Sequence, residues 1–127
     1  MVKTKLKEGA KFDDMKPRYD LIPPSLLHAV AMVLTYGADK YEDRNWEKGI
    51  KYGRIFGAMS RHAWAWFVGE DIDPESNLPH LWHVACNIAF LVHFTSNPKR
   101  YITFDNRPEC DEVSYRTIEF TRYKEKK

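Results

Sequence analysis

The chain has 127 residues, of which 43% are hydrophobic and 30% charged, and its net charge is +2 at pH 7. These values are typical of a soluble globular protein with a core of its own, so we expect a single domain over residues 1–127. The small net charge gives no support to nucleic acid or a membrane surface as a partner. No apolar run is long enough to span a bilayer.

The first segment, residues 1–22, is polar and then extended, because Pro17, Pro23 and Pro24 exclude a helix interior. We expect an N-terminal arm here. Apolar residues at helical spacing then predict a helix over about 24–36, which Gly37 would end with a left-handed cap. A polar connection follows, with a further helical turn predicted around residues 38–43.

Two longer helices are predicted over about 53–68 and about 78–94. The short loop between them favours an antiparallel hairpin. Ser76 or Asn77 is the expected N-cap of the second of these helices, with Pro79 in its first turn. Its expected core face comprises six apolar residues: Leu81, Val84, Ala85, Ile88, Leu91 and Val92.

Residues 99–123 alternate between polar and apolar or β-branched side chains on either side of the turn-rich segment NRPECDE. This pattern predicts a β-hairpin that packs on the helices or on another subunit. The expected fold is therefore mainly α: a small helical bundle with an extended N-terminal arm, a helical core over about 23–95 and a C-terminal β-hairpin.

The segment GEDIDPESNLPHLWH, residues 69–83, gathers four carboxylates and two histidines at the junction of the two longer helices. Glu70 and Asp73 lie three residues apart, a spacing at which carboxylates can share a hard cation such as Mg²⁺ or Mn²⁺. Equally, Asp73 and Glu75 suit a charged turn before the positive N-terminus of the next helix. Asp39 and Glu42 form a second such pair, and two acidic pairs on separate helices hold the metals of all-α nucleoside triphosphate pyrophosphohydrolases.

A second stripe on the last helix begins with His80, His83 and Asn87 and ends with two phenylalanines. His62 lies within the apolar stripe of the preceding helix. Each histidine alone is compatible with a hydrogen-bonded structural role. The antiparallel hairpin, however, would bring His62 close to His83 or Asn87, which indicates a polar site between the helices.

Basic residues flank aromatic residues in the first half of the chain. Cations beside stackable rings suit a phosphorylated base, with Lys or Arg on the phosphate and Tyr or Trp on the ring. A surface loop with one anchored tryptophan is the alternative. The residues concerned are Lys16, Arg18, Lys40, Arg44 and Lys48, with Tyr41, Asn45 and Trp46 among them.

Three blocks of sequence together resemble a known family: KFDDMKPRYDLIPPSLL, LTYGADKYEDRNWEKGIKYGR and RHAWAWFVGEDIDPESNLPHLWHVACNIAFLV. In order and spacing they are similar to the phage and bacterial dATP/dGTP diphosphohydrolase N-terminal domain, which is related to MazG-like all-α pyrophosphohydrolases. The resemblance implies hydrolysis of purine deoxynucleoside triphosphates to monophosphate and pyrophosphate, with Mg²⁺ or Mn²⁺. It also implies a homo-oligomer, dimer or tetramer. We expect a cytoplasmic protein, in the host cell cytoplasm if a phage encodes it.

The same resemblance implies roles for thirteen residues. The candidate catalytic residues are His62, Glu70 and His83. The candidate metal ligands are Glu70, Asp73, Glu75 and His80. The candidate substrate-binding residues are Arg18, Lys40, Tyr41, Asn45, Trp46, Arg61 and Asn87.

One feature departs from the MazG pattern. The helix predicted over residues 24–36 has no Glu-x-x-Glu pair and carries His28 instead. Two alternatives to an enzyme therefore stay open: a sponge-like phage protein that binds nucleotides without catalysis, and a structural or interaction module.

Overall fold

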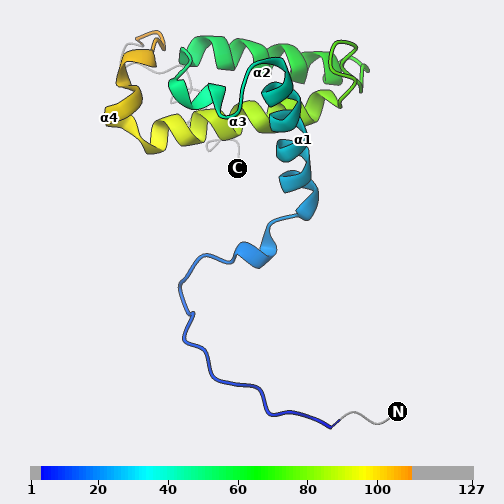
Figure 1. The fold of residues 1–127 in the computed structure, drawn as a ribbon, viewed down its shortest axis with the longest axis vertical. Helices are drawn as coiled ribbons and strands as arrows, with labels where there is room; N and C mark the ends of the chain where they lie inside the picture. Colours follow the sequence, from blue (N-terminus) through cyan, green and yellow to red (C-terminus); the bar gives the residue numbers. More distant parts are fainter. Residues whose placement is uncertain (1–3, 110–127) are drawn as a thin grey trace, which may run out of the picture.

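The computed structural model describes residues 4–109. Three long helices and four short helical segments follow one another along the chain (Figure 1). Within residues 4–109 there is no β-strand, only an isolated bridge between Ile72 and Pro79. The elements are η1 (Tyr19–Leu21), α1 (Pro24–Lys40), η2 (Asn45–Lys48), α2 (Tyr52–Phe67), α3 (His80–Ser96), α4 (Pro98–Tyr101) and η3 (Ile102–Phe104).

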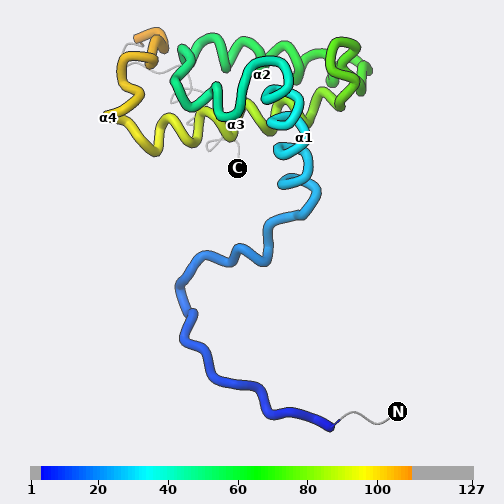
Figure 2. Tube along the Cα trace, in the orientation of Figure 1, coloured from blue at the N-terminus to red at the C-terminus, as the bar shows by residue number. Residues whose placement is uncertain are grey.

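The helices α2 and α3 lie side by side as an antiparallel hairpin, and α1 crosses this hairpin and packs on α3 (Figure 2). The predicted mainly α fold and antiparallel hairpin are therefore confirmed. Before α1 the chain runs away from the helices as the predicted extended arm (Figure 1). None of the helices in the described part of the chain is long and apolar enough to cross a membrane.

The first helix is longer than predicted. Gly37 does not end it, because the N–H of Tyr41 donates to the carbonyl of Gly37 at 2.9 Å and the helix continues to Lys40. The predicted left-handed cap at Gly37 is therefore wrong, and Asp39 belongs to the last turn of α1. The start of α3 also differs, since Pro79 precedes its first residue and no side chain caps it.

The first strand of the predicted hairpin is wrong, because Pro98–Tyr101 and Ile102–Phe104 are helical. The physical reason is tertiary. Tyr101 is 1% exposed, and its hydroxyl donates to the carbonyl of Glu47 at 2.7 Å, which folds the chain back over the helices. The second predicted strand lies outside the described residues.

Aromatic residues form the core at the end of the hairpin where α3 meets α4. Tyr52 and Phe94 stack with their ring planes 3° apart, and Phe94 is fully buried. Trp46, Phe90 and Tyr101 complete this group, which we call the aromatic end. Burial of each such ring contributes about 1.5–3 kcal/mol to folding.

The two stripes of α3 differ in burial from the sequence-based expectation. His80, His83 and Phe94 are buried, whereas Leu81 and Val92, on the predicted core face, are 44% and 58% exposed. Leu91, by contrast, packs against the buried core, so in the isolated chain the predicted core face is wrong at its exposed positions but not throughout. Helical periodicity separates the two stripes but does not say which of them contacts α2.

Candidate functional site

A cleft of about 1110 Å³ opens between the second half of α1, the η2 segment and the inner faces of α2 and α3. This volume is slightly above the range of about 300–1,000 Å³ that is usual for small-molecule and cofactor sites. The cleft is therefore large enough for a nucleotide.

Most of the sequence-predicted site residues line this cleft. They come from distant parts of the chain and meet because α1 crosses the α2–α3 hairpin. Those that line it are Lys40, Tyr41, Asn45, Trp46, Arg61, His62, Asp73, Glu75, His83 and Asn87.

Three histidines meet at the end of the hairpin near the α2–α3 loop. The Nδ1 atoms of His62 and His80 lie 2.8 Å apart, and the rings of His62 and His83 stack at 4.3 Å with 8° between their planes. Glu70 lies behind this group, with its Oε1 at 2.7 Å from Nε2 of His80. Thus neither Glu70 nor His80 lines the cleft: His80 contacts His62, which does, and Glu70 contacts His80 from behind.

Asp73 and Ser76 complete this group. The Ser76 hydroxyl donates to Oδ2 of Asp73 at 2.7 Å and lies 2.7 Å from Nε2 of His83. Because the hydroxyl proton is given to Asp73, the oxygen accepts from His83, which places the His83 proton on Nε2. We call His62, Asp73, His80 and His83 the histidine end of the hairpin.

Burial and hydrogen bonding shift the pKa values of this end. Desolvation, reinforced by neighbouring histidines, lowers the pKa of His62 and of His83 from the ordinary value of 6.5. Both rings are therefore neutral near pH 7 and can accept a proton or a metal ion. Desolvation acts to raise the pKa of Asp73, but hydrogen bonds from Ser76 and the Glu75 N–H hold it below its usual value.

Ion pairs cross the mouth of the cleft. The Lys40 ammonium binds Glu75 at 2.7 Å, and this hydrogen bond raises the pKa of Lys40. Glu42 forms a second ion pair, with Lys48. Arg61 projects from α2 with its guanidinium against Gly57. An anionic ligand would therefore meet exchangeable cations at this opening.

The two predicted base-binding rings differ in their surroundings. Trp46 stacks on Phe90 at 5.0 Å and meets the edge of His93 at 4.9 Å, so its ring belongs to the aromatic end. Tyr41 is 64% exposed, with the Lys40 ammonium 5.6 Å from its ring centre. Both rings line the cleft, and Tyr41 is the more exposed of the two.

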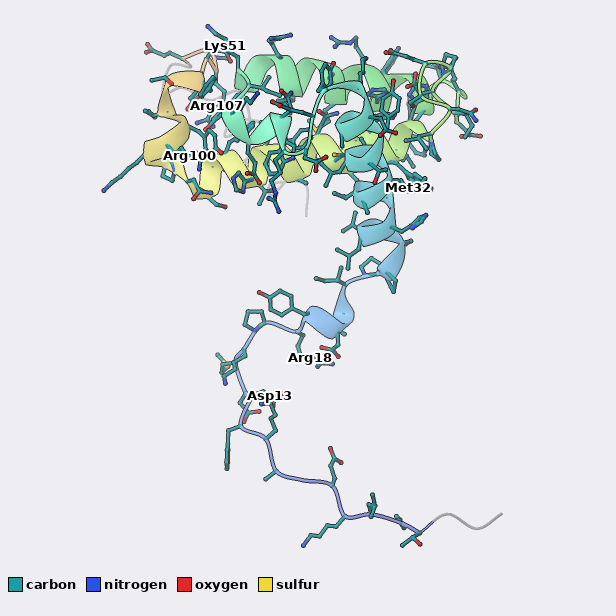
Figure 3. All side chains as sticks on the ribbon, viewed as in Figure 1. Asp13, Arg18, Met32, Lys51, Arg100 and Arg107 are labelled. Atoms are coloured by element: carbon teal, nitrogen blue, oxygen red, sulfur yellow. The ribbon has the colours of Figure 1, made fainter. Side chains whose placement is uncertain are left out.

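Arg18 is the one predicted site residue that the structure keeps away from the others. It lies on the N-terminal arm, outside the helical body, and pairs with Asp20 at 2.7 Å (Figure 3). Within this chain Arg18 therefore does not reach the cleft.

Sequence reasoning missed Ser76 as a site residue and treated it only as a helix cap. The Asp-x-x-Ser spacing was the available signal, because Asp73 accepts both the N–H and the hydroxyl of Ser76. Tyr36 and Cys86 also line the cleft. Burial raises the pKa of the Cys86 thiol to about 12, so this cysteine is no nucleophile at neutral pH.

Similarity to known proteins identifies the family of the chain. The family model for the dATP/dGTP diphosphohydrolase N-terminal domain matches residues 7–106 of the chain. The chain belongs to this family. The match confirms the resemblance read from the three sequence blocks, and it includes the arm, the cleft and both ends of the hairpin.

A phage relative agrees with this assignment. The chain is 34% identical over 104 residues to a protein of Salmonella phage PMBT28 named dATP/dGTP diphosphohydrolase. The aligned region covers 82% of this chain but 32% of the relative, so the chain spans about a third of the relative's length. No solved structure matches the chain significantly.

Proposed function

We propose that the chain is a metal-dependent pyrophosphohydrolase that converts purine deoxynucleoside triphosphates to monophosphates and pyrophosphate. The observation that carries this proposal is the cleft, where a histidine and carboxylate wall faces exposed cations and an exposed tyrosine. Membership of the dATP/dGTP diphosphohydrolase N-terminal family and the name of the phage relative support the choice of substrate.

The donor set fits a divalent cation, expected to be Mg²⁺ or Mn²⁺. Asp73 and His80, two of the four ligands predicted from the sequence, offer donor atoms within 4.8 Å of each other. Glu70 and Glu75 instead contact His80 and Lys40. When bound, the ion would lower the pKa of a water molecule and offset phosphate charge.

Other residues of the cleft would accept the proton, offset phosphate charge and bind the base and sugar. The water oxygen forms a bond to the α-phosphorus, the bond from that phosphorus to the α,β-bridging oxygen breaks, and the water proton passes to the neutral imidazole of His83. Lys40 and Arg61 would offset the charge on the departing pyrophosphate. Tyr41 would stack on the base, and Asn87 and Asn45 would contact the sugar or base from the walls.

A panel of deoxynucleoside triphosphates tests this proposal. With Mn²⁺ or Mg²⁺, dATP and dGTP should yield monophosphate and pyrophosphate, resolved by ion-exchange chromatography. Glu70→Gln should lower turnover at least about tenfold because His80 loses the carboxylate that orients it. Glu8→Gln, on the exposed arm, is the matched control and should retain full turnover. Absence of turnover of every purine triphosphate by the folded wild type would refute the proposal.

A nucleotide-binding protein without catalysis is the second candidate. It is favoured by the lack of a Glu-x-x-Glu pair on the helix predicted over residues 24–36. Of the nearby acidic pair Asp39 and Glu42, Glu42 is moreover paired with Lys48. On this alternative, purine nucleotides would bind equally well with and without chelator. They would be recovered intact after long incubation with Mn²⁺.

We also propose that the chain acts as a homo-oligomer, a dimer or tetramer. Apolar side chains remain uncovered on the outer side of α3, where Ile88 is 47% and Val92 58% exposed, and on α2, where Phe67 is 70% exposed. Large apolar side chains left exposed on two helices favour association. Light scattering should give a multiple of the 15.0 kDa chain mass, and Ile88→Lys should reduce it. A monomer at micromolar concentration would contradict this proposal.

A further inference from the structure

Three residues from three separate segments place metal-binding atoms around one point at the histidine end. They are His62 on α2, Asp73 in the α2–α3 loop and His80 at the start of α3, and their donor atoms lie within 4.8 Å of one another. Ligand atoms bound to one first-row ion at about 2.0–2.2 Å lie at most roughly 4 Å apart. Only small side-chain adjustments therefore separate the observed arrangement from a coordinated ion.

Glu70 determines which nitrogen of His80 is available. An ionised carboxylate only accepts hydrogen bonds, so the contact of 2.7 Å with Oε1 of Glu70 places a proton on Nε2 of His80. In the neutral ring Nδ1 then carries a lone pair, which accepts a hydrogen bond from Nδ1–H of His62 at 2.8 Å, so a bound ion would take the place of that proton between the two rings. A carboxylate behind a histidine is the usual support of a metal-bound imidazole.

Asp73 also has a free coordination position. Its Oδ2 accepts from the hydroxyl and the N–H of Ser76, whereas among residues 4–109 its Oδ1 accepts one long bond, 3.3 Å from the Glu75 N–H. The side chain is 13% exposed, so the loop holds it in place. His83 is engaged by Ser76 and stacks on His62, which orients the His62 ring.

This donor set differs from the one that Mg²⁺ prefers. Mg²⁺ takes oxygen ligands in a strict octahedron, whereas imidazole nitrogens suit the later first-row ions, such as Fe²⁺, Co²⁺, Ni²⁺ and Zn²⁺. We propose that His62, Asp73 and His80 bind one first-row transition-metal ion in preference to Mg²⁺, with Glu70 as the residue that orients His80. The inference rests on the proposed function, because it names the ion of the same site, but its test needs no turnover.

Cobalt is the probe of choice, because Co²⁺ bound by nitrogen and oxygen ligands absorbs visible light. Titration of the nucleotide-free protein with Co²⁺ should produce a visible band that saturates at one ion per chain. A hundredfold excess of Mg²⁺ should leave the band in place, and one equivalent of Zn²⁺ should remove it.

The variants His62→Gln and His80→Gln should each weaken Co²⁺ binding at least tenfold, with circular dichroism as the check of folding. His93→Gln is the matched control, since His93 lies on α3 at the aromatic end, beside Trp46 and Tyr101. Where a glutamine variant does not fold, Co²⁺-dependent relaxation of the His62 and His80 ring protons in the wild-type NMR spectrum replaces it. No band, a band removed by Mg²⁺, or equal loss in His93→Gln would overturn the proposal.

The two proposals fail separately. A chain that binds Co²⁺ at the histidine end but turns over no purine triphosphate would refute the proposed function and leave the metal site standing. A chain that turns over dGTP with Mg²⁺ and shows no Co²⁺ band would refute the metal site alone.

Discussion

The aromatic end and the histidine end lie on the same α2–α3 hairpin and share one stripe of α3, yet they serve different purposes. At the aromatic end, Phe94 and Tyr101 are 0% and 1% exposed and are surrounded by other rings. At the histidine end, His80 and His83 are almost as buried, but each ring nitrogen contact is to a polar partner. The first end supplies stability, and the second maintains polar groups beside the cleft.

This contrast has a physical cause. Burial of a ring lowers the free energy of the folded chain directly, whereas burial of an imidazole is favourable only when its nitrogens are hydrogen-bonded. At the histidine end, Glu70 is hydrogen-bonded to His80, and Ser76 is hydrogen-bonded to both Asp73 and His83. Among the described residues no buried side-chain polar atom lacks a hydrogen-bond partner. A polar network can therefore occupy half of a helix interface when the other half provides the packing.

The largest effect on stability is expected from Phe94→Ala. The ring is fully buried against Tyr52 and Tyr101, so its removal leaves a cavity and should lower the free energy of unfolding by about 3–5 kcal/mol. Urea denaturation measures this change. Phe12→Ala, at a site on the arm that is 91% exposed, is the control of equal chemistry and should stay within about 0.5 kcal/mol of wild type.

A smaller effect is expected from Tyr101→Phe, which keeps the buried ring and removes only the hydroxyl. The hydroxyl donates to the carbonyl of Glu47, so its loss should lower the free energy of unfolding by about 1–3 kcal/mol. Urea denaturation again gives the value. A loss as large as that of Phe94→Ala would show that the hydroxyl, not the ring, holds α4 on the body.

The histidine end should respond to pH, with the smallest effect of the three. In the unfolded chain these histidines titrate near the ordinary pKa of 6.5, and burial lowers the pKa of His62 and His83 in the folded chain. As the pH falls below about 6.5, the unfolded chain takes up protons first, so the folded state loses stability. Above that pH the two groups make no pH-dependent contribution.

Melting temperatures in EDTA from about pH 8 to about pH 5 measure this dependence. The groups that face His62 are His80, His83, Asp73 and Arg61. His83→Gln should flatten the curve, because one of the two depressed histidines is gone. A melting temperature that rises on acidification would contradict the assignment of neutral, buried rings.

The helices were predictable from the sequence because apolar spacing and proline positions are local signals. The first predicted strand failed because a local alternation cannot register that Tyr101 is buried against Glu47 and Phe94. Gly37 failed as a stop because glycine tolerates a helix interior when the chain continues favourably around it. The strand error therefore comes from a tertiary contact that outweighs local preference, whereas the Gly37 error comes from helical hydrogen bonding that continues past the glycine.

The sequence predicted which residues belong to the site better than it predicted how they contact one another. Helix spacing placed His80, His83 and Asn87 on one stripe, and the hairpin brought His62 to that stripe. The role of Ser76 and the contact of Glu70 with His80 depend on the path of the α2–α3 loop, which no periodicity describes. The distance of Arg18 from the cleft likewise follows from the course of the arm.

Product analysis with Asp73→Asn tests the account most directly. Asparagine keeps the shape of the side chain but removes its charge at the histidine end. The wild type should convert dGTP or dATP to the monophosphate and pyrophosphate with Mn²⁺, and folded Asp73→Asn should lose at least about 99% of that turnover. Equal turnover by the two proteins, or no turnover of either purine by the wild type, would contradict the account.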